Sequence, residues 1–135
     1  MTMGIARINP PALFDSTQNH HSQVTVVEAG RLAFCSGQVA WRPGGLDVPA
    51  RLADQAEVVV GHLRTCLDAV GADTPDIVML RVYVVDLTPE RVGEVMPHLR
   101  SFLGAAQPSL TGIGVQALAG PDLQIEIEMV VQVPS

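Results

Sequence analysis

The chain has 135 residues, of which 47% are hydrophobic, and a formal net charge of −6. Its length fits one domain, residues 1–135, with a sizeable core, and no apolar run approaches the ~20 residues that a membrane span needs. The eight basic residues, all arginines, stand singly and aromatic residues make up only 4%, unlike a phosphate-binding or base-stacking surface. Composition therefore disfavours nucleic acid and membrane partners.

The N-terminal segment MTMGIARINP lacks the cationic start and long apolar core of a secretory signal, which predicts a cytoplasmic protein. Cys35 and Cys66 lie in a strand-like and a helix-like segment and form no CxxC motif. Both are expected to be reduced thiols in the core, since disulfides are rare in the cytoplasm.

Three short β-rich segments open the chain, at residues 5–8, 24–28 and 32–36. The polar segment between the first and the second has no periodicity and is expected to be a loop. The second and third segments flank an Ala-Gly-Arg turn, which predicts a β-hairpin.

A first helix is predicted over residues 50–70, where apolar residues recur at three- and four-residue steps. Asp47 ahead of Pro49 suits its start, and Gly71 suits its end because glycine accepts a positive φ.

A second helix is predicted from Thr88, a favourable N-cap that is followed by proline in the first turn, to Gly104. Pro97 lies inside this helix. Because an internal proline removes a backbone hydrogen bond, we expect a kink or a short break there.

Residues 77–85 are nearly all apolar and rich in β-branched side chains, which predicts a strand covered on both faces. Arg81 is the exception, and the alternation of side chains places it on the same face as Met79 and Tyr83. A cation in that position needs a carboxylate partner, a ligand or access to water.

Residues 108–133 contain two β-rich runs around a Gly-Pro-Asp turn, which predicts an antiparallel hairpin. On the second run Glu126 and Glu128 point to one face, while Ile125 and Ile127 point to the other. The two carboxylates therefore lie either at the solvent edge of the sheet or in a cleft.

The predicted order is β-β-β-α-β-α-β-β, an α+β fold with a mixed six-stranded sheet and both helices on one face. Two helices cannot cover both faces of such a sheet. Since the strand at residues 77–85 is too apolar to leave one face wet, the uncovered face is expected to pack on another subunit of a closed homo-oligomer.

In this order and spacing, several short motifs resemble the RidA/YjgF family (reactive intermediate deaminases, also called endoribonuclease L-PSP-like) over nearly the whole chain. The markers are Ser22-Gln23, Ser36-Gly37-Gln38, Gln55, Val70-Gly71-Ala72, Tyr83 with Asp86-Leu87, Phe102, Pro108 and Ile125-Glu126-Ile127-Glu128. The resemblance implies a chorismate-mutase-like fold, a homotrimer with clefts between subunits, and no cofactor. It also implies hydrolysis of small enamines and imines, such as 2-aminoacrylate, to a keto acid and ammonia.

The chain departs from the family pattern at three positions. In the family an arginine two residues after the proline at Pro108 holds the substrate carboxylate through two parallel hydrogen bonds, and Leu110 stands in its place. His21 replaces the usual tyrosine, and Gly93 falls where an asparagine is usual. The glutamate matched by Glu126 and the serine matched by Ser36 are kept.

The resemblance thus makes Glu126, His21 and Ser36 the candidate catalytic residues, and Leu110, Gly112, Gly93 and Arg81 the candidate substrate-binding residues. A partly desolvated Glu126 would accept a proton from an attacking water. A histidine titrates near neutral pH, so the side chain at His21 would act as acid, base or donor, unless it is a solvated loop histidine. Ser36 either binds the ligand or caps a turn.

Two alternatives concern charged residues. Arg81 either anchors an anion or forms a structural ion pair. His20 and His21 with Glu126 have the chemistry of metal ligands, but adjacent loop residues rarely direct both rings at one ion and the resemblance implies no metal.

The expected function is therefore that of a homotrimer whose cleft takes a small metabolite and performs hydrolytic or proton-transfer chemistry on an imine, an enamine or a related molecule. Because Leu110 replaces the arginine, a standard 2-aminoacrylate deaminase is not expected. The alternative is a non-catalytic trimer that binds a metabolite or a partner. A ribonuclease activity fits poorly with the negative charge and the sparse aromatic residues.

Overall fold

The computed structural model describes residues 4–135; residues 1–3, where the segment assessed for a secretory signal begins, lie outside the description. The elements follow the predicted order. Their bounds are β1 Ala6–Ile8, β2 Val24–Val26, β3 Leu32–Gln38, α1 Leu52–Ala69, β4 Ile77–Val85, α2 Pro89–Leu103, β5 Ser109–Val115 and β6 Ile125–Gln132, with short 3-10 helices η1 Ser16–Asn19, η2 Pro43–Gly45 and η3 Thr74–Asp76.

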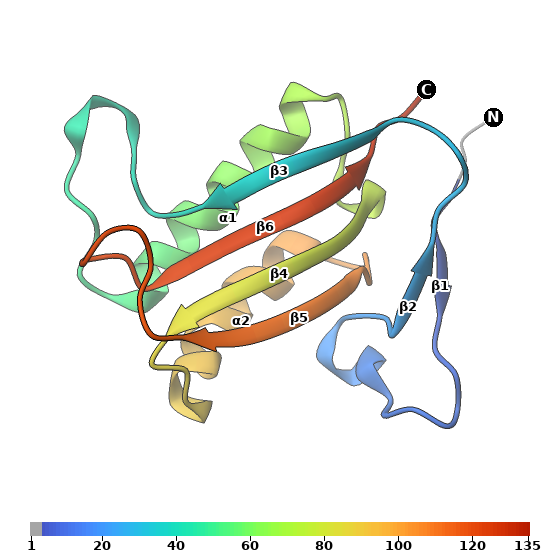
Figure 1. Ribbon diagram of the computed structural model, residues 1–135, viewed down its shortest axis with the longest axis horizontal. Helices are drawn as coiled ribbons and strands as arrows, with labels where there is room; N and C mark the ends of the chain where they lie inside the picture. The colour runs from blue at the N-terminus through green and yellow to red at the C-terminus, as the bar shows by residue number, and fades with distance from the viewer. Residues whose placement is uncertain (1–3) are drawn as a thin grey trace.

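The six strands form two sheets rather than the predicted single one. A four-stranded sheet has the order β3-β6-β4-β5, and β1 pairs with β2 alone (Figure 1). Arg7 of β1 donates through Nη1 to the Ile77 carbonyl at 3.2 Å, and Thr25 of β2 donates through Oγ1 to the Val78 carbonyl at 3.1 Å. These side-chain bonds, in place of a backbone ladder, attach the small sheet near the start of β4.

The predicted hairpin of residues 24–28 and 32–36 is wrong. β2 pairs with β1, while β3 pairs in antiparallel fashion with β6, close to the other end of the chain. The segment between β2 and β3 carries the chain from one sheet to the other. A glycine turn between two β-rich runs therefore does not decide which strands pair.

The predicted hairpin of residues 108–133 is also wrong. β5 pairs in parallel with β4, and β6 lies on the other side of β4, antiparallel to it. Residues 116–124 are a connection long enough to pass the end of β4. The parallel pairing places β5 at the edge of the sheet and β6 in its interior (Figure 1).

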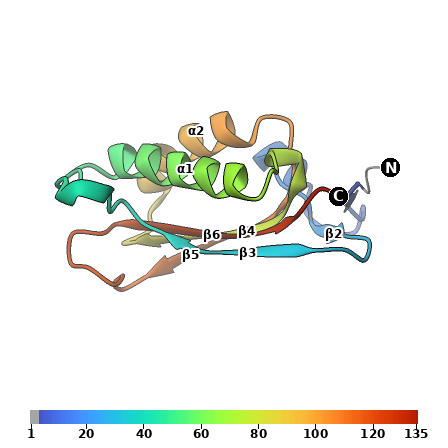
Figure 2. The same cartoon turned by 90° about the horizontal axis from the view of Figure 1, so that it is seen from above.

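Both helices lie on the same side of the sheet, as predicted (Figure 2). The apolar stripe of each helix meets the inward side chains of β4 and β6, and burial of each large aliphatic side chain contributes roughly 2 kcal/mol. The residues at the centre of this core are Val59, Leu63, Leu67, Leu80, Val82, Val95, Leu99, Leu103, Ile125, Ile127 and Met129. Neither α1 nor α2 is long and apolar enough to cross a membrane.

The predicted helix ends are confirmed for α2. The Thr88 side chain accepts from the Arg91 backbone N–H at 3.2 Å, and Gly104 has a φ of 57°. The helix runs through Pro97 without the expected break. Because Pro97 and Gly93 are both exposed, water can reach the Gly93 carbonyl that the proline leaves without a partner. In α1 the N-cap position is Arg51, with no side-chain cap, so Asp47 does not cap this helix.

Candidate functional site

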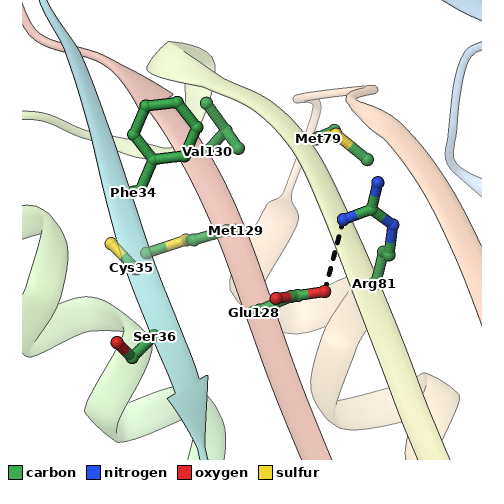
Figure 3. Close-up of a pocket in the computed structure, with 8 residues that line it drawn as sticks. All are labelled: Phe34, Cys35, Ser36, Met79, Arg81, Glu128, Met129 and Val130. Atoms are coloured by element: carbon green, nitrogen blue, oxygen red, sulfur yellow. Dashed lines mark hydrogen bonds and ion pairs between the residues drawn. The ribbon is translucent and has the colours of Figure 1, made fainter.

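The two glutamates of β6 share the face of the sheet that the helices leave uncovered, but their surroundings differ. Tyr83 of β4 donates its hydroxyl to Glu128, and Arg81 Nη1 lies 3.3 Å from Glu128 Oε1 (Figure 3). The hydrogen bond from Tyr83, and next the bond and charge of Arg81, hold the pKa of Glu128 below its ordinary value, and the same bond raises the pKa of Tyr83. Glu128 is therefore the carboxylate partner that Arg81 was expected to need.

The side chain of Glu126 extends over the neighbouring strand β3 at the position of Gly37. A Cβ atom at Gly37 would stand only 2.1 Å from Glu126 Oε2, so the absent side chain of Gly37 is what makes room for the carboxylate. The β3–β6 register shifts between Cys35 and Gln38, at this point of β3. Among residues 4–135, no hydrogen bond or ion pair joins Glu126 to another side chain. Its carboxylate is thus available to a ligand.

The carboxylate opens into a cavity of about 320 Å³, which we call the Glu126 pocket. Trp41, from the β3–α1 loop, and His62, from α1, form part of its wall, and His62 donates through Nε2 to the Trp41 carbonyl at 2.8 Å. The lining residues are Gly37, Gln38, Val39, Trp41, His62, Ala119 and Glu126. The sequence analysis did not identify His62 or Trp41 as residues of this site.

Ser36 lies one residue before Gly37 but borders a different hollow. This second cavity, of about 410 Å³, lies on the uncovered face of the sheet and is lined by Phe34, Cys35, Ser36, Met79, Arg81, Glu128, Met129 and Val130 (Figure 3). Ser36 and Arg81 are thus brought together around Glu128 rather than around Glu126.

Leu110 and Gly112 point to the helix-covered side of β5. Leu110 packs against the core, and with Gly112 it lines an apolar pocket of about 80 Å³ between β5 and α2. Gly93 is an exposed residue of α2 that does not line this pocket. Within one chain, Leu110 and Glu126 therefore face opposite sides of the sheet.

His21 lies near the start of β5, in the loop after η1, where its Nδ1 is 3.2 Å from the Asn19 carbonyl. The following residue, Ser22, forms a bridge with Ser109 at the edge of the sheet. From the strand spacing and rise, His21 and Glu126 of the same chain are on the order of 20 Å apart. Within the described residues, no three His, Cys, Asp or Glu side chains lie together in a way that could hold a metal ion.

The two cysteines are free thiols packed against the core, as predicted. Burial, and next the neighbouring Cys66, raise the pKa of Cys35 to about 11. Cys35 is thus a protonated, unreactive thiol at neutral pH and not a candidate nucleophile.

Comparison with known proteins shows the family to which the chain belongs. Residues 14–133 match the family model described as "Endoribonuclease L-PSP". Over 131 residues the chain is 29% identical to the 2-iminobutanoate/2-iminopropanoate deaminase of Escherichia coli K12, covering 96% of this chain and 97% of the enzyme. Protein DfrA of Myxococcus xanthus is 35% identical over 100 residues, which are 73% of this chain and 74% of DfrA.

A solved structure of similar shape is the Rid family protein YyfB of Yersinia pestis, a protein of unknown function. It superposes with a TM-score of 0.89 at 35% identity, over 96% of this chain and 99% of YyfB. With the family model matching 14–133 and these relatives matching most of the chain, the protein belongs to the endoribonuclease L-PSP family, which is the RidA/YjgF family that its motifs resemble.

Proposed function

We propose that the protein hydrolyses a small imine, enamine or related molecule in the Glu126 pocket. The observation that carries this proposal is the Glu126 carboxylate, which lies over Gly37 at an open cavity while Glu128 is engaged by Tyr83 and Arg81. A carboxylate without a protein partner is free to hold a water molecule and to accept its proton. The deaminase relatives support this chemistry.

In the proposed step, a water oxygen attacks the carbon of the protonated imine and gives a proton to Glu126. The C–O bond forms as the C=N double bond becomes single, which yields a neutral carbinolamine. Glu126 then gives the proton to the nitrogen, the C–N bond breaks and ammonia leaves, and the hydroxyl group passes its proton back to Glu126 as it becomes the carbonyl. The proton on Glu126 finally passes to ammonia, which restores the carboxylate. Three lining residues of the pocket, Gln38, Trp41 and His62, define where the substrate lies.

The substrate differs from that of a standard 2-aminoacrylate deaminase. Leu110 stands at the position of the family arginine, and no lysine or arginine lines the Glu126 pocket. A substrate carboxylate would therefore find no bidentate anchor there. Because Leu110 packs against the core on the helix side, Leu110→Arg would bury an unpaired charge and is expected to lower the melting temperature without improving the binding of small keto acids. Calorimetry that shows tighter keto-acid binding in this variant would contradict the placement of Leu110.

The functional unit in this proposal is a homotrimer. The uncovered face of the sheet exposes Phe34 to 76% and Leu32 to 42%, beside the half-buried Met79 and Val130. Burial of these side chains against a second copy would stabilise the assembly. His21 is too far from Glu126 of its own chain, so it assists catalysis only if it reaches the pocket of a neighbouring subunit.

The second candidate is a trimer that binds a metabolite or a partner without turnover. The position of Leu110 favours it, because this side chain packs in an apolar pocket on the helix side instead of anchoring a substrate. In this case Glu126 contributes to affinity alone.

The decisive experiment measures ammonia release from a panel of imines and enamines that includes 2-aminoacrylate. We expect turnover of a substrate without a carboxylate, and a loss of 10²-fold or more in Glu126→Gln, about the usual contribution of a general base. The matched control is Glu128→Gln, two residues along the same face, which should retain activity. If no substrate turns over and Glu126→Gln changes only ligand affinity, the binding protein is the correct reading.

A further inference from the structure

The Glu126 pocket has a negative charge, and among residues 4–135 no Lys or Arg side chain lines it. Glu126 is the one carboxylate among the described lining residues. The one histidine, His62, donates through Nε2 to the Trp41 carbonyl oxygen, and the other lining residues have uncharged side chains or none. The nearby Arg42 bends into its own loop and donates to the Asp47 carbonyl. The whole chain carries a net charge of −6. Local and global charge therefore both favour a cation over an anion.

Trp41 supplies the second element of a cation site. Trp41 is 53% exposed, so part of the residue remains open at the pocket. Its ring also packs closely against the β5–β6 loop, because a Cβ at Gly120 would lie 3.1 Å from Trp41 Cζ2. The bond from His62 holds the Trp41 backbone, and the contact at Gly120 holds the ring against the loop. Tryptophan is the side chain whose face attracts cations most strongly.

The two recognition groups are each placed by a glycine. Gly37 makes room for the carboxylate of Glu126, and Gly120 makes room for the ring of Trp41. A larger residue at either position would displace the group beside it. The local backbone is therefore built to present a carboxylate and an indole to one cavity.

We propose that the Glu126 pocket binds the positively charged nitrogen of a small organic cation, with Glu126 supplying the counter-charge and Trp41 an aromatic wall. Protonated imines and amines without a carboxylate have this chemistry. The inference rests on the proposed function, in which this pocket is the ligand site, and it defines the class of substrate as cationic nitrogen compounds.

Choline and its uncharged isostere 3,3-dimethyl-1-butanol form a matched pair of probes. Trp41 is the single tryptophan of the sequence, so intrinsic fluorescence reports directly on this wall. We expect a saturable change with choline and a dissociation constant about tenfold or more higher for the isostere, in line with a desolvated cation–π contact beside a carboxylate. Propionate should give no change.

Two variants with the same substitution test the counter-charge. Glu126→Gln should raise the dissociation constant of choline about tenfold, and Glu128→Gln should leave it within about twofold, with equal melting temperatures as the check on folding. Equal affinity for the two probes, no saturable change with choline, or equal losses in the two variants would each overturn the proposal.

The outcome is separable from that of the hydrolase assay. Selective choline binding without turnover of any imine would leave the cation site standing and remove the proposed catalysis. Turnover that depends on Glu126, combined with equal affinity for choline and its isostere, would support the proposed catalysis and rule out the cation site.

Discussion

At the scale of single residues, Gly37 controls where the Glu126 carboxylate lies. An alanine Cβ there would stand 2.1 Å from Oε2 and 2.6 Å from Cδ of Glu126. The glutamate side chain is flexible, so we expect Gly37→Ala to turn it away from the pocket and to abolish activity with little change in melting temperature. A crystal structure of the variant with Glu126 unmoved would contradict this expectation.

A second residue-scale prediction concerns the pH dependence of Glu128. Its pKa is lowered chiefly by the hydrogen bond from Tyr83, so the stabilising contribution of this pair is complete above the ordinary value of 4.5 and is lost as pH falls through the lowered pKa. Tyr83→Phe should move the pKa of Glu128 up toward 4.5, with Arg81 as the remaining partner. Carboxyl ¹³C NMR titration measures the shift, and an unchanged pKa would show that the Tyr83 bond is not formed in solution.

At the scale of elements, the helices contain glycines whose effects should have opposite signs. Gly61 is an exposed interior residue of α1 with open space around its Cβ position, whereas Gly104 ends α2 with a φ of 57°. Gly61→Ala should stabilise the fold by about 1 kcal/mol. Gly104 has a ψ of −127°, outside the left-handed helical region, so Gly104→Ala should destabilise the fold by roughly 1–3 kcal/mol. Urea denaturation of both variants provides the test, and shifts of the same sign would contradict it.

The sequence predicted the elements better than their pairing. Apolar periodicity identified α1 and α2, and alternation put Glu126 and Arg81 on the uncovered face. Turn signals are local, however. β3 pairs with β6, which is distant in the sequence, and β5 pairs in parallel with β4, so both expected hairpins were wrong.

The same limit applies to the site. Glu126 was identified from the family motif. His62 was missed because it lies in α1, where the spacing of apolar residues indicates only which side of the helix packs on the core. Gly37 in a strand and Gly120 in a turn are positions that could have signalled the close approach of another group. Which group approaches depends on the order of strands in the sheet, which the sequence alone did not provide.

At the scale of the whole molecule, the exposed face of the sheet leads to a prediction about assembly. Phe34 is 76% exposed on this face, so a charge there costs little in an isolated subunit but much in an apolar interface. The proposed homotrimer should therefore dissociate to monomers in the Phe34→Glu variant, as measured by analytical ultracentrifugation, while the far-UV circular dichroism is kept. Thr65→Glu, at an exposed position of α1, is the control and should sediment like the unmodified protein.

The interior position of β6 also has a consequence for synthesis on the ribosome. β6 follows the other described strands in the chain, yet it pairs with both β3 and β4. Until β6 has been made, β3 and β4 each present an unpaired edge and the core is incomplete, so the earlier elements must wait for β6 or be shielded by chaperones. Pairing of β6 with its two neighbours is therefore expected to be the step that completes the sheet.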